Sequence, residues 1–356
     1  MSFDGDSLSL EGFESLVESA FKARIFHHLT SLQEITIFEC FSAVSFPANC
    51  LPERLQKLQI KNCKKLASLS LDAFPNVKNL RLEHCLNLES ISMSESPHTA
   101  LQSLKIIGCH KLVSLSEEGQ AAPNLTHLLI NSCPKLEALP RNMDTLLPNL
   151  QFLEIEECGG ICRFPEGGLP PNMETLCMSG YEEQLRDLSS NGKLEALKHL
   201  VINGRDCERV KSFPEVVDLL PHLPSLTTLC FEEFDDLETL ECNQLLRLTS
   251  LQHLLILSCP KLKNIPGRSG RRGRRSGIGA EIWLHVFEKQ RHLQKVGVAL
   301  IIDKLLLLNE QFDEENKERE GDQHYYPSDA ADGNSDYDLL SPLMWAHGNS
   351  MFNILV

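Results

Sequence analysis

Apolar residues recur along this chain in one spacing, at intervals of 22 to 29 residues. The stretch 125–140 shows it clearly, because its residues follow the order L-x-x-L-x-I-x-x-C-x-x-L-x-x-L-P. Such a period indicates a repeat protein, in which each copy buries its apolar face only against its neighbours. Ten copies share one register when Leu125 is taken as position 1, and their first positions are Leu32, Leu55, Val77, Leu101, Leu125, Leu150, Met173, Leu197, Leu226 and Leu251.

Positions 4 and 6 are apolar in all ten copies, as in the pair Leu128 and Ile130. This period-2 alternation predicts a short strand with one buried face. A Pro-Asn turn signal often precedes the strand, where proline cannot interrupt the hydrogen-bonded ladder. The segment after position 9 is too short and irregular for long helices. We therefore predict an α/β-type repeat solenoid, a leucine-rich-repeat horseshoe with a parallel β-sheet on its concave face and mostly loops and 3₁₀ turns on its convex face.

The repeat array covers residues 28–266, and the flanking segments differ from it in composition. Residues 1–27 fit a degenerate N-terminal repeat or cap. Residues 267–280 contain five arginines and five glycines, which predicts a flexible basic linker. Residues 281–308 have apolar residues at helical spacing and predict a helix. Residues 309–356 are acidic and then low in pattern, which predicts a disordered tail.

The net charge of −15 argues against general nucleic-acid binding, and it is unevenly distributed. Residues 309–338 hold eleven Asp and Glu against Lys317 and Arg319, so most of the acidity belongs to the tail. The arginine run 271–275 is interpreted as a solvated linker, with a nuclear-localisation or nucleic-acid patch as the alternative. No secretory signal and no run of about 18 apolar residues is visible. These observations predict a cytoplasmic protein, with a nuclear location also open, that binds no membrane.

Seven of the thirteen cysteines are spaced by the repeat itself. A small side chain that turns inward at the end of each strand would fill a limited space and bond weakly with loop backbone. A zinc site needs sulfur atoms that converge on one ion, whereas a ladder spreads them along a line. We therefore predict a structural ladder at position 9, made by Cys40, Cys63, Cys85, Cys109, Cys133, Cys158 and Cys259.

Catalytic motifs are absent from the sequence, which has no phosphate loop, no H-E-x-x-H and no G-x-S-x-G. The sequon at Asn124 is interpreted as a coincidence, because Leu125 within it is a predicted core residue. The sequence therefore predicts a protein that is not an enzyme and that has no cofactor or metal in this chain.

The function class that remains is binding to a partner. Positions 2, 3, 5, 7 and 8 should face the concave side, where a partner could bind. Basic residues gather there in the second to fourth copies and acidic residues in the sixth and ninth, with apolar residues between them. The alternative is an ordinary solvated surface of mixed charge. The predicted partner-binding residues are Lys57, Lys61, Lys78, Arg81 and Lys105, then Ile107, Leu129 and Phe152, then Glu154, Glu156 and Glu157, with Glu232 and Glu233 further along.

The repeats at 101–115 and 251–266, and above all the stretch 164–176 (F-P-E-G-G-L-P-P-N-M-E-T-L), resemble the C-terminal leucine-rich repeats of plant NLR immune receptors. This resemblance covers about residues 28–266. It implies a solenoid that recognises a pathogen effector, directly or through a guarded host protein. It also implies that the repeats hold a nucleotide-binding domain inactive until recognition.

The coiled coil, the phosphate loop and the other nucleotide-site motifs of that family are absent here. ADP or ATP is therefore expected only on the missing nucleotide-binding domain. Two other classes stay open. One is a substrate receptor of an F-box-type ubiquitin ligase, although residues 1–27 are too short for an F-box. The other is a non-signalling decoy or truncated fragment.

Overall fold

The computed structural model describes residues 2–12, 25–39, 51–92, 96–115, 121–161, 163–165, 167–179, 184, 187–188, 194–205, 212–213, 223–240, 248–262 and 283–287. The chain divides into two compact units, Met1–Lys289 and Gln290–Val356, and all the described residues lie in the first. The predicted linker, the predicted acidic tail, residues 281–282 and 288–308 of the predicted helix, and Cys40 lie outside the described residues.

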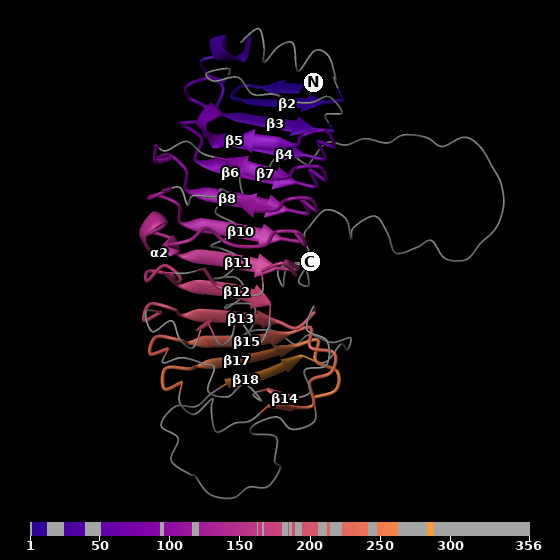
Figure 1. Ribbon diagram of the computed structural model, residues 1–356, viewed down its shortest axis with the longest axis vertical. Helices are drawn as coiled ribbons and strands as arrows, with labels where there is room; N and C mark the ends of the chain where they lie inside the picture. The colour runs from indigo at the N-terminus through magenta and orange to yellow at the C-terminus, as the bar shows by residue number, and fades with distance from the viewer. Residues whose placement is uncertain are drawn as a thin grey trace, which may run out of the picture. The chain divides into compact units, whose positions relative to one another are not determined.

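A thirteen-stranded sheet runs through the repeat array, and its strands stack in chain order (Figure 1). Each predicted copy contributes one strand that begins at position 3 and ends at position 7, parallel to its neighbours. Leu128, for example, pairs with Leu104 on one side and with Leu153 on the other. The predicted solenoid and its register are therefore confirmed, and the strands are β3 (Glu34–Phe38), β4 (Lys57–Lys61), β6 (Asn79–Glu83), β8 (Ser103–Ile107), β10 (His127–Asn131), β11 (Phe152–Glu156), β12 (Thr175–Ser179), β13 (His199–Asn203), β15 (Thr228–Glu232) and β17 (His253–Leu257).

Further strands extend the sheet at both ends. At the N-terminal end, β2 (Ser7–Glu11) pairs with β3 in parallel, and β1 (Ser2–Asp4) pairs with β2 in the antiparallel sense. At the other end, β18 (Trp283–Phe287) pairs with β17 in parallel. The helix predicted over residues 281–308 is therefore wrong for 283–287. The edge of β17 offers unpaired backbone groups, and satisfying them outweighs the local helical pattern.

Among the described residues, the other side of the repeats consists mainly of turns, as predicted, with short strands that the sequence pattern did not predict. These are a three-stranded sheet of β5 (Ser68–Ser70), β7 (Ser90–Ser92) and β9 (Ser114–Leu115), and a pair formed by β14 (Ser212–Phe213) and β16 (Thr239–Leu240). The helical turns are η1 (Ile25–His28), η2 (Leu71–Ala73) and α2 (Met143–Leu146). No helix among the described residues is long and apolar enough to cross a membrane.

The core is a continuous stack of side chains from positions 1, 4 and 6. In the fifth copy, Leu125, Leu128 and Ile130 are each 2% exposed or less. Position 8 turns the chain from the strand toward this core, because the residue there has positive φ in eight of the copies: Glu39, Asn62, His84, Gly108, Ser132, Glu157, Glu233 and Ser258. The left-handed conformation is strained for residues other than glycine, so the repeat geometry imposes it.

Asparagine side chains join consecutive repeats just before position 1. Asn76, Asn124, Asn149 and Asn172 each donate from Nδ2 to a backbone carbonyl of the preceding repeat, over 2.7–3.0 Å. These bonds give the Asn of the Pro-Asn turns a structural role. They also place the sequon nitrogen of Asn124 in a bond to the Thr99 carbonyl.

Candidate protein-interaction face

The face of the long sheet opposite the core carries positions 3, 5 and 7, and we name it the ladder face. In β3 and β6 these positions are half-exposed, whereas in β11, β12 and β15 every position is buried. β12 (TLCMS) and β15 (TLCFE) have an apolar residue at position 5 as well as at positions 4 and 6, whereas β11 (FLEIE) has a buried glutamate there. Parallel strands buried on both faces have this more continuous apolar pattern.

The basic band (Lys57, Lys61, Lys78, Arg81 and Lys105) lies on or beside β4, β6 and β8. Two carboxylates that were not predicted from the sequence, Glu34 and Glu83, partly neutralise the charge of the basic band. Glu34 pairs with Lys57 over 3.3 Å and Glu83 with Lys61 over 3.2 Å, and Arg81 donates from Nε to Glu83 over 2.6 Å. Burial acts to raise the pKa of Glu83, but Arg81 and Lys61 together hold that pKa below its ordinary value, so Glu83 stays ionised.

Ile107, Leu129 and Phe152 lie on the ladder face between the basic and acidic residues. Their predicted exposure is wrong, because they are only 8%, 8% and 9% exposed. In-register residues of neighbouring parallel strands stand about 4.8 Å apart and shield one another. The ring of Phe152 also stacks on that of His127, with centroids 5.8 Å apart. An apolar centre is therefore present, but it is packed rather than open.

The acidic cluster consists of Glu154, Glu156, Glu157, Glu232 and Glu233, which come from the middle and end of β11, the end of β15 and the turns that follow. The fold brings these two acidic groups, far apart in sequence, into one electrostatic environment. Glu154, Glu156 and Glu232 are buried, at 1%, 2% and 2% exposure, although their positions were predicted to face solvent. The side chains of Glu157 and Glu233 are 23% and 25% exposed.

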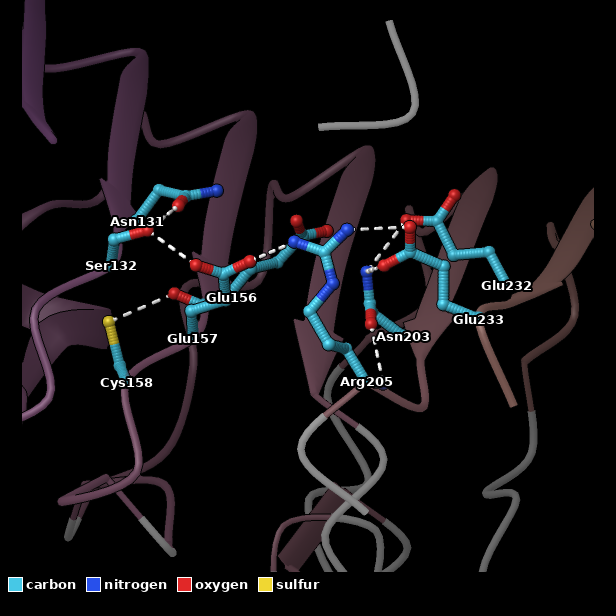
Figure 2. Close-up of polar contacts among 9 residues, drawn as sticks. All are labelled: Asn131, Ser132, Glu156, Glu157, Cys158, Asn203, Arg205, Glu232 and Glu233. Carbon is cyan, nitrogen blue, oxygen red and sulfur yellow. Dashed lines mark hydrogen bonds and ion pairs between the residues drawn. The ribbon is translucent and has the colours of Figure 1, made fainter. Parts of the chain in front are cut away.

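Arg205 joins the two halves of the acidic cluster, as Figure 2 shows. One terminal nitrogen of its guanidinium bonds to Glu157, and the other donates to Glu233 over 2.6 Å. Asn203, on β13, donates from Nδ2 to Glu232 over 2.9 Å and accepts a bond from the backbone N–H of Arg205. Neither residue was predicted from the sequence. A signal for Arg205 was present, because it occupies position 9, where most other copies have cysteine.

The outward direction of Arg205 follows from a change in the core. Phe234 occupies position 9 of the next copy, is 2% exposed and packs edge-on against Phe231, with centroids 6.1 Å apart. A Cβ placed on Gly204 would lie 2.3 Å from the Phe234 ring. Gly204 also lacks the positive φ found at position 8 of other copies. Because the large ring fills the space beside this backbone, the side chain at 205 extends to the edge of the ladder face.

Burial raises the pKa of the three inner carboxyls. The pKa of Glu154 rises to about 7, and the Asn131 amide and Lys105 oppose this rise. The pKa of Glu232 also rises to about 7, through burial and then the charge of Glu233, while the hydrogen bond from Asn203 opposes it. The pKa of Glu156 lies well above its ordinary value, through burial and then the charges of Glu154 and Glu232. Burial therefore favours the protonated form of Glu154, Glu156 and Glu232.

The structure describes six of the seven ladder cysteines. Five of them are buried, and Cys259 is half-buried. Each thiol lies 3.1–3.8 Å from the backbone carbonyl two residues earlier, for example Cys133 Sγ 3.4 Å from Asn131 O. Within the described ranges, no three His, Cys, Asp or Glu side chains are grouped so that they could hold a metal ion. This geometry is that of a packing position with a weak donor.

Comparison with known proteins supports the resemblance that the repeats suggested. The chain is similar to a putative disease resistance protein of Arabidopsis thaliana, with 30% identity over 244 residues, which is 58% of this chain. A probable disease resistance protein of the same plant is 31% identical over 41% of the chain, and disease resistance protein RPS6 is 28% identical over 55%. The similarity to plant disease resistance proteins is thus confirmed.

The match covers 16%, 15% and 16% of the lengths of these three relatives. The chain therefore corresponds to a small part of each of them. No protein-family model matches the chain.

Proposed function

We propose that this chain is the protein-recognition module of a plant intracellular immune receptor. Its ladder face would bind a pathogen effector or a guarded host protein, and would hold inactive a nucleotide-binding domain that this chain does not contain. The similarity of the repeats to disease resistance proteins supports the defence role. The separation of opposite charges along one face is the observation that supports recognition by docking.

Oppositely charged regions on one face set the orientation and the association rate of a protein partner more than its final affinity. The basic band lies on β4 to β8, and the acidic cluster lies at the ends of β11 and β15. The packed apolar residues between them give a rigid surface rather than an anchor pocket. We propose that an acidic surface of the partner, or of the receptor's own nucleotide-binding domain, meets the basic band.

In this proposal the module has no catalytic role. The module would act by binding in the cytoplasm, and in the nucleus where the receptor enters it. It would need no cofactor, no nucleic acid and no membrane. An F-box-type ubiquitin-ligase receptor remains the alternative for a repeat face of this kind, and a non-signalling decoy would keep the same binding face without the downstream response.

The test is a fourfold charge reversal in the basic band, with Lys57, Lys61, Arg81 and Lys105 changed to glutamate. The probe is a nucleotide-binding domain from a receptor of the family that the repeats resemble, measured at low and at physiological salt. We expect weaker binding and a smaller salt dependence, because fewer ion pairs form.

A matched control carries the same change of charge off the ladder face. Lys64, Lys65, Lys111 and Lys135 are exposed and lie on the turns after the strands, so reversing all four should leave the binding unchanged. Equal effects of the two quadruple variants, with unchanged circular dichroism, would eliminate the basic band as the contact.

A further inference from the structure

Some buried carboxylate oxygens of the acidic cluster have no hydrogen-bond donor. The Asn131 amide lies near enough to Glu154 to oppose the rise that burial causes in its pKa. Neither carboxylate oxygen of Glu154, and not Oε2 of Glu156, has a partner that meets hydrogen-bond geometry among the described residues. Both side chains are at least nine-tenths buried. The two carboxylates and that of Glu232 act on one another electrostatically, so they share one site. Buried carboxylates without donors cost free energy until a cation or a donor reaches them.

Arg205 shows which cation the rim of this site accepts. Its planar guanidinium spans from Glu157 to Glu233, which come from strands separated by β12 and β13. The side chains of Arg205, Glu157 and Glu233 are 34%, 23% and 25% exposed, so this rim is open to solvent. A guanidinium presents its donors in a rigid fork that matches carboxylates, whereas an ammonium group acts as a point charge.

We infer that the acidic cluster is a docking site for an arginine side chain of a protein partner, and that Arg205 occupies its rim as a competitor in the unbound chain. This inference rests on the proposed function, since it names the partner's chemistry at the second charged region of the same face. The incoming guanidinium takes the place of Arg205 between Glu157 and Glu233. Its remaining N–H groups face the carboxylates of Glu154 and Glu156, whose unpartnered oxygens Arg205 does not reach.

The probe is a short synthetic peptide, acetyl-Gly-Arg-Gly-Arg-Gly-amide, and its counterpart with citrulline in place of arginine. Citrulline keeps the shape and most donors of arginine but has no charge. Calorimetry with the full chain at pH 8 should show binding of the arginine peptide about tenfold tighter or more, because hydrogen bonds between charged groups are the strong ones. Equal affinity for the two peptides would overturn the inference.

Three variants locate the binding. The double variant Glu157→Gln with Glu233→Gln removes the charge of the rim and should reduce binding of the arginine peptide to the level of the citrulline peptide. Arg205→Gln removes the competitor and should raise the affinity severalfold. Glu174→Gln is the matched control, because Glu174 pairs with Lys198 outside the cluster. The acidic residues 310–338 are the same in every variant, so differences between the variants do not arise from them.

Arginine-peptide affinity that falls equally in the double variant and in Glu174→Gln would contradict the rim as the site. Unchanged or lower affinity in Arg205→Gln would contradict the competition. Circular dichroism and thermal unfolding establish that each variant is folded. The citrulline comparison requires no variant at all. A negative result with the arginine peptide would not change the outcome expected for charge reversal in the basic band. The two proposals can therefore fail separately.

Discussion

The copies that form β4 to β11 and those that form β13 and β15 differ in how the chain leaves the strand at positions 8 and 9. In the first group a small cysteine at position 9 enters the core after a left-handed residue, as at Cys109 and Cys133. In the second group Phe234 fills the core, Gly204 keeps clear of its ring, and Arg205 extends outward. One change of core volume is thus linked to two neighbouring positions, and it places a cation among the glutamates.

The two groups also differ in how their charges are matched. The basic band has Glu34 and Glu83 as neighbours on adjacent or identical strands. The acidic cluster relies on Arg205, which reaches its two partners across 28 and 48 residues of sequence. Local pairing balances the first region. The second depends on the exact stacking of several repeats.

The largest effect on stability is expected at Leu128, in the group of copies with cysteine at position 9. Leu128 is 2% exposed at the centre of the stack, so Leu128→Ala should lower the free energy of unfolding by about 2–5 kcal/mol. Leu128→Asp should cost more, because it also buries a charge. Urea unfolding measures both. Thr126→Ala is the control, with about 1 kcal/mol expected for its lost bond to the Gln102 carbonyl. Identical curves for Leu128→Asp and the parent would refute the register.

The next largest effect is expected at Phe234 and Gly204, in the copies that form β13 and β15. Phe234→Cys should cost about 3 kcal/mol or more through the cavity that it leaves. Gly204→Ala should cost about 1–3 kcal/mol, because its Cβ meets the Phe234 ring. Together the two changes should cost less than their sum, since the smaller residue makes room for the Cβ. Strict additivity in urea unfolding would mean that the two positions are not coupled.

A pH-dependent effect should appear in the acidic cluster. The folded-state pKa values of Glu154 and Glu232, about 7, lie above the ordinary value of 4.5. Their contribution to stability is therefore fully present below pH 4.5 and is lost as the pH rises through about 7. Glu154→Gln should raise the free energy of unfolding at pH 8 by up to about 3 kcal/mol and change it little at pH 4.5.

The matched control for this pH effect is Glu174→Gln, whose parent side chain is 43% exposed. It should leave the slope of stability against pH as it is in the parent. If the slopes of the two variants agree across pH 4.5 to 8, then Glu154 does not titrate as its burial predicts.

The smallest effect is expected at the cysteine ladder. Cys109→Ala removes one small buried sulfur and a weak bond to the Ile107 carbonyl, and about 1 kcal/mol should be lost. Thermal unfolding in the presence of a reductant measures it. A loss as large as that of Phe234→Cys would show that the ladder does more than fill space.

The sequence predicts the strands well, because their signal is local. Leu58 and Ile60 are two residues apart, and the same pair recurs in every copy, so the register follows from counting. The strand Trp283–Phe287 was missed, because its short pattern also fits a helix and the edge of β17 is visible only in the fold. The short strands such as β7 were missed because two or three residues carry little periodicity.

The candidate site could be predicted only in part. The positions of Lys57, Arg81, Glu154 and Glu156 on one face follow from the strand period. Their partners do not, since Glu83 serves two cations at once and Arg205 appears in sequence as a departure from the cysteine pattern. The burial of Leu129 and Phe152 could not be read from alternation, because alternation assigns a face and not its exposure.

The sequence alone determined the repeat, its register and the order of charges along the ladder face, since all three depend on residues a fixed number of places apart. The tertiary structure decided which carboxylates are buried, which cation joins them and which apolar residues are packed. The physical reason is that burial and ion pairing depend on distances between repeats. Arg205 meets Glu157 only because the strands that precede them, β13 and β11, are separated by the single strand β12 at the regular spacing of the sheet.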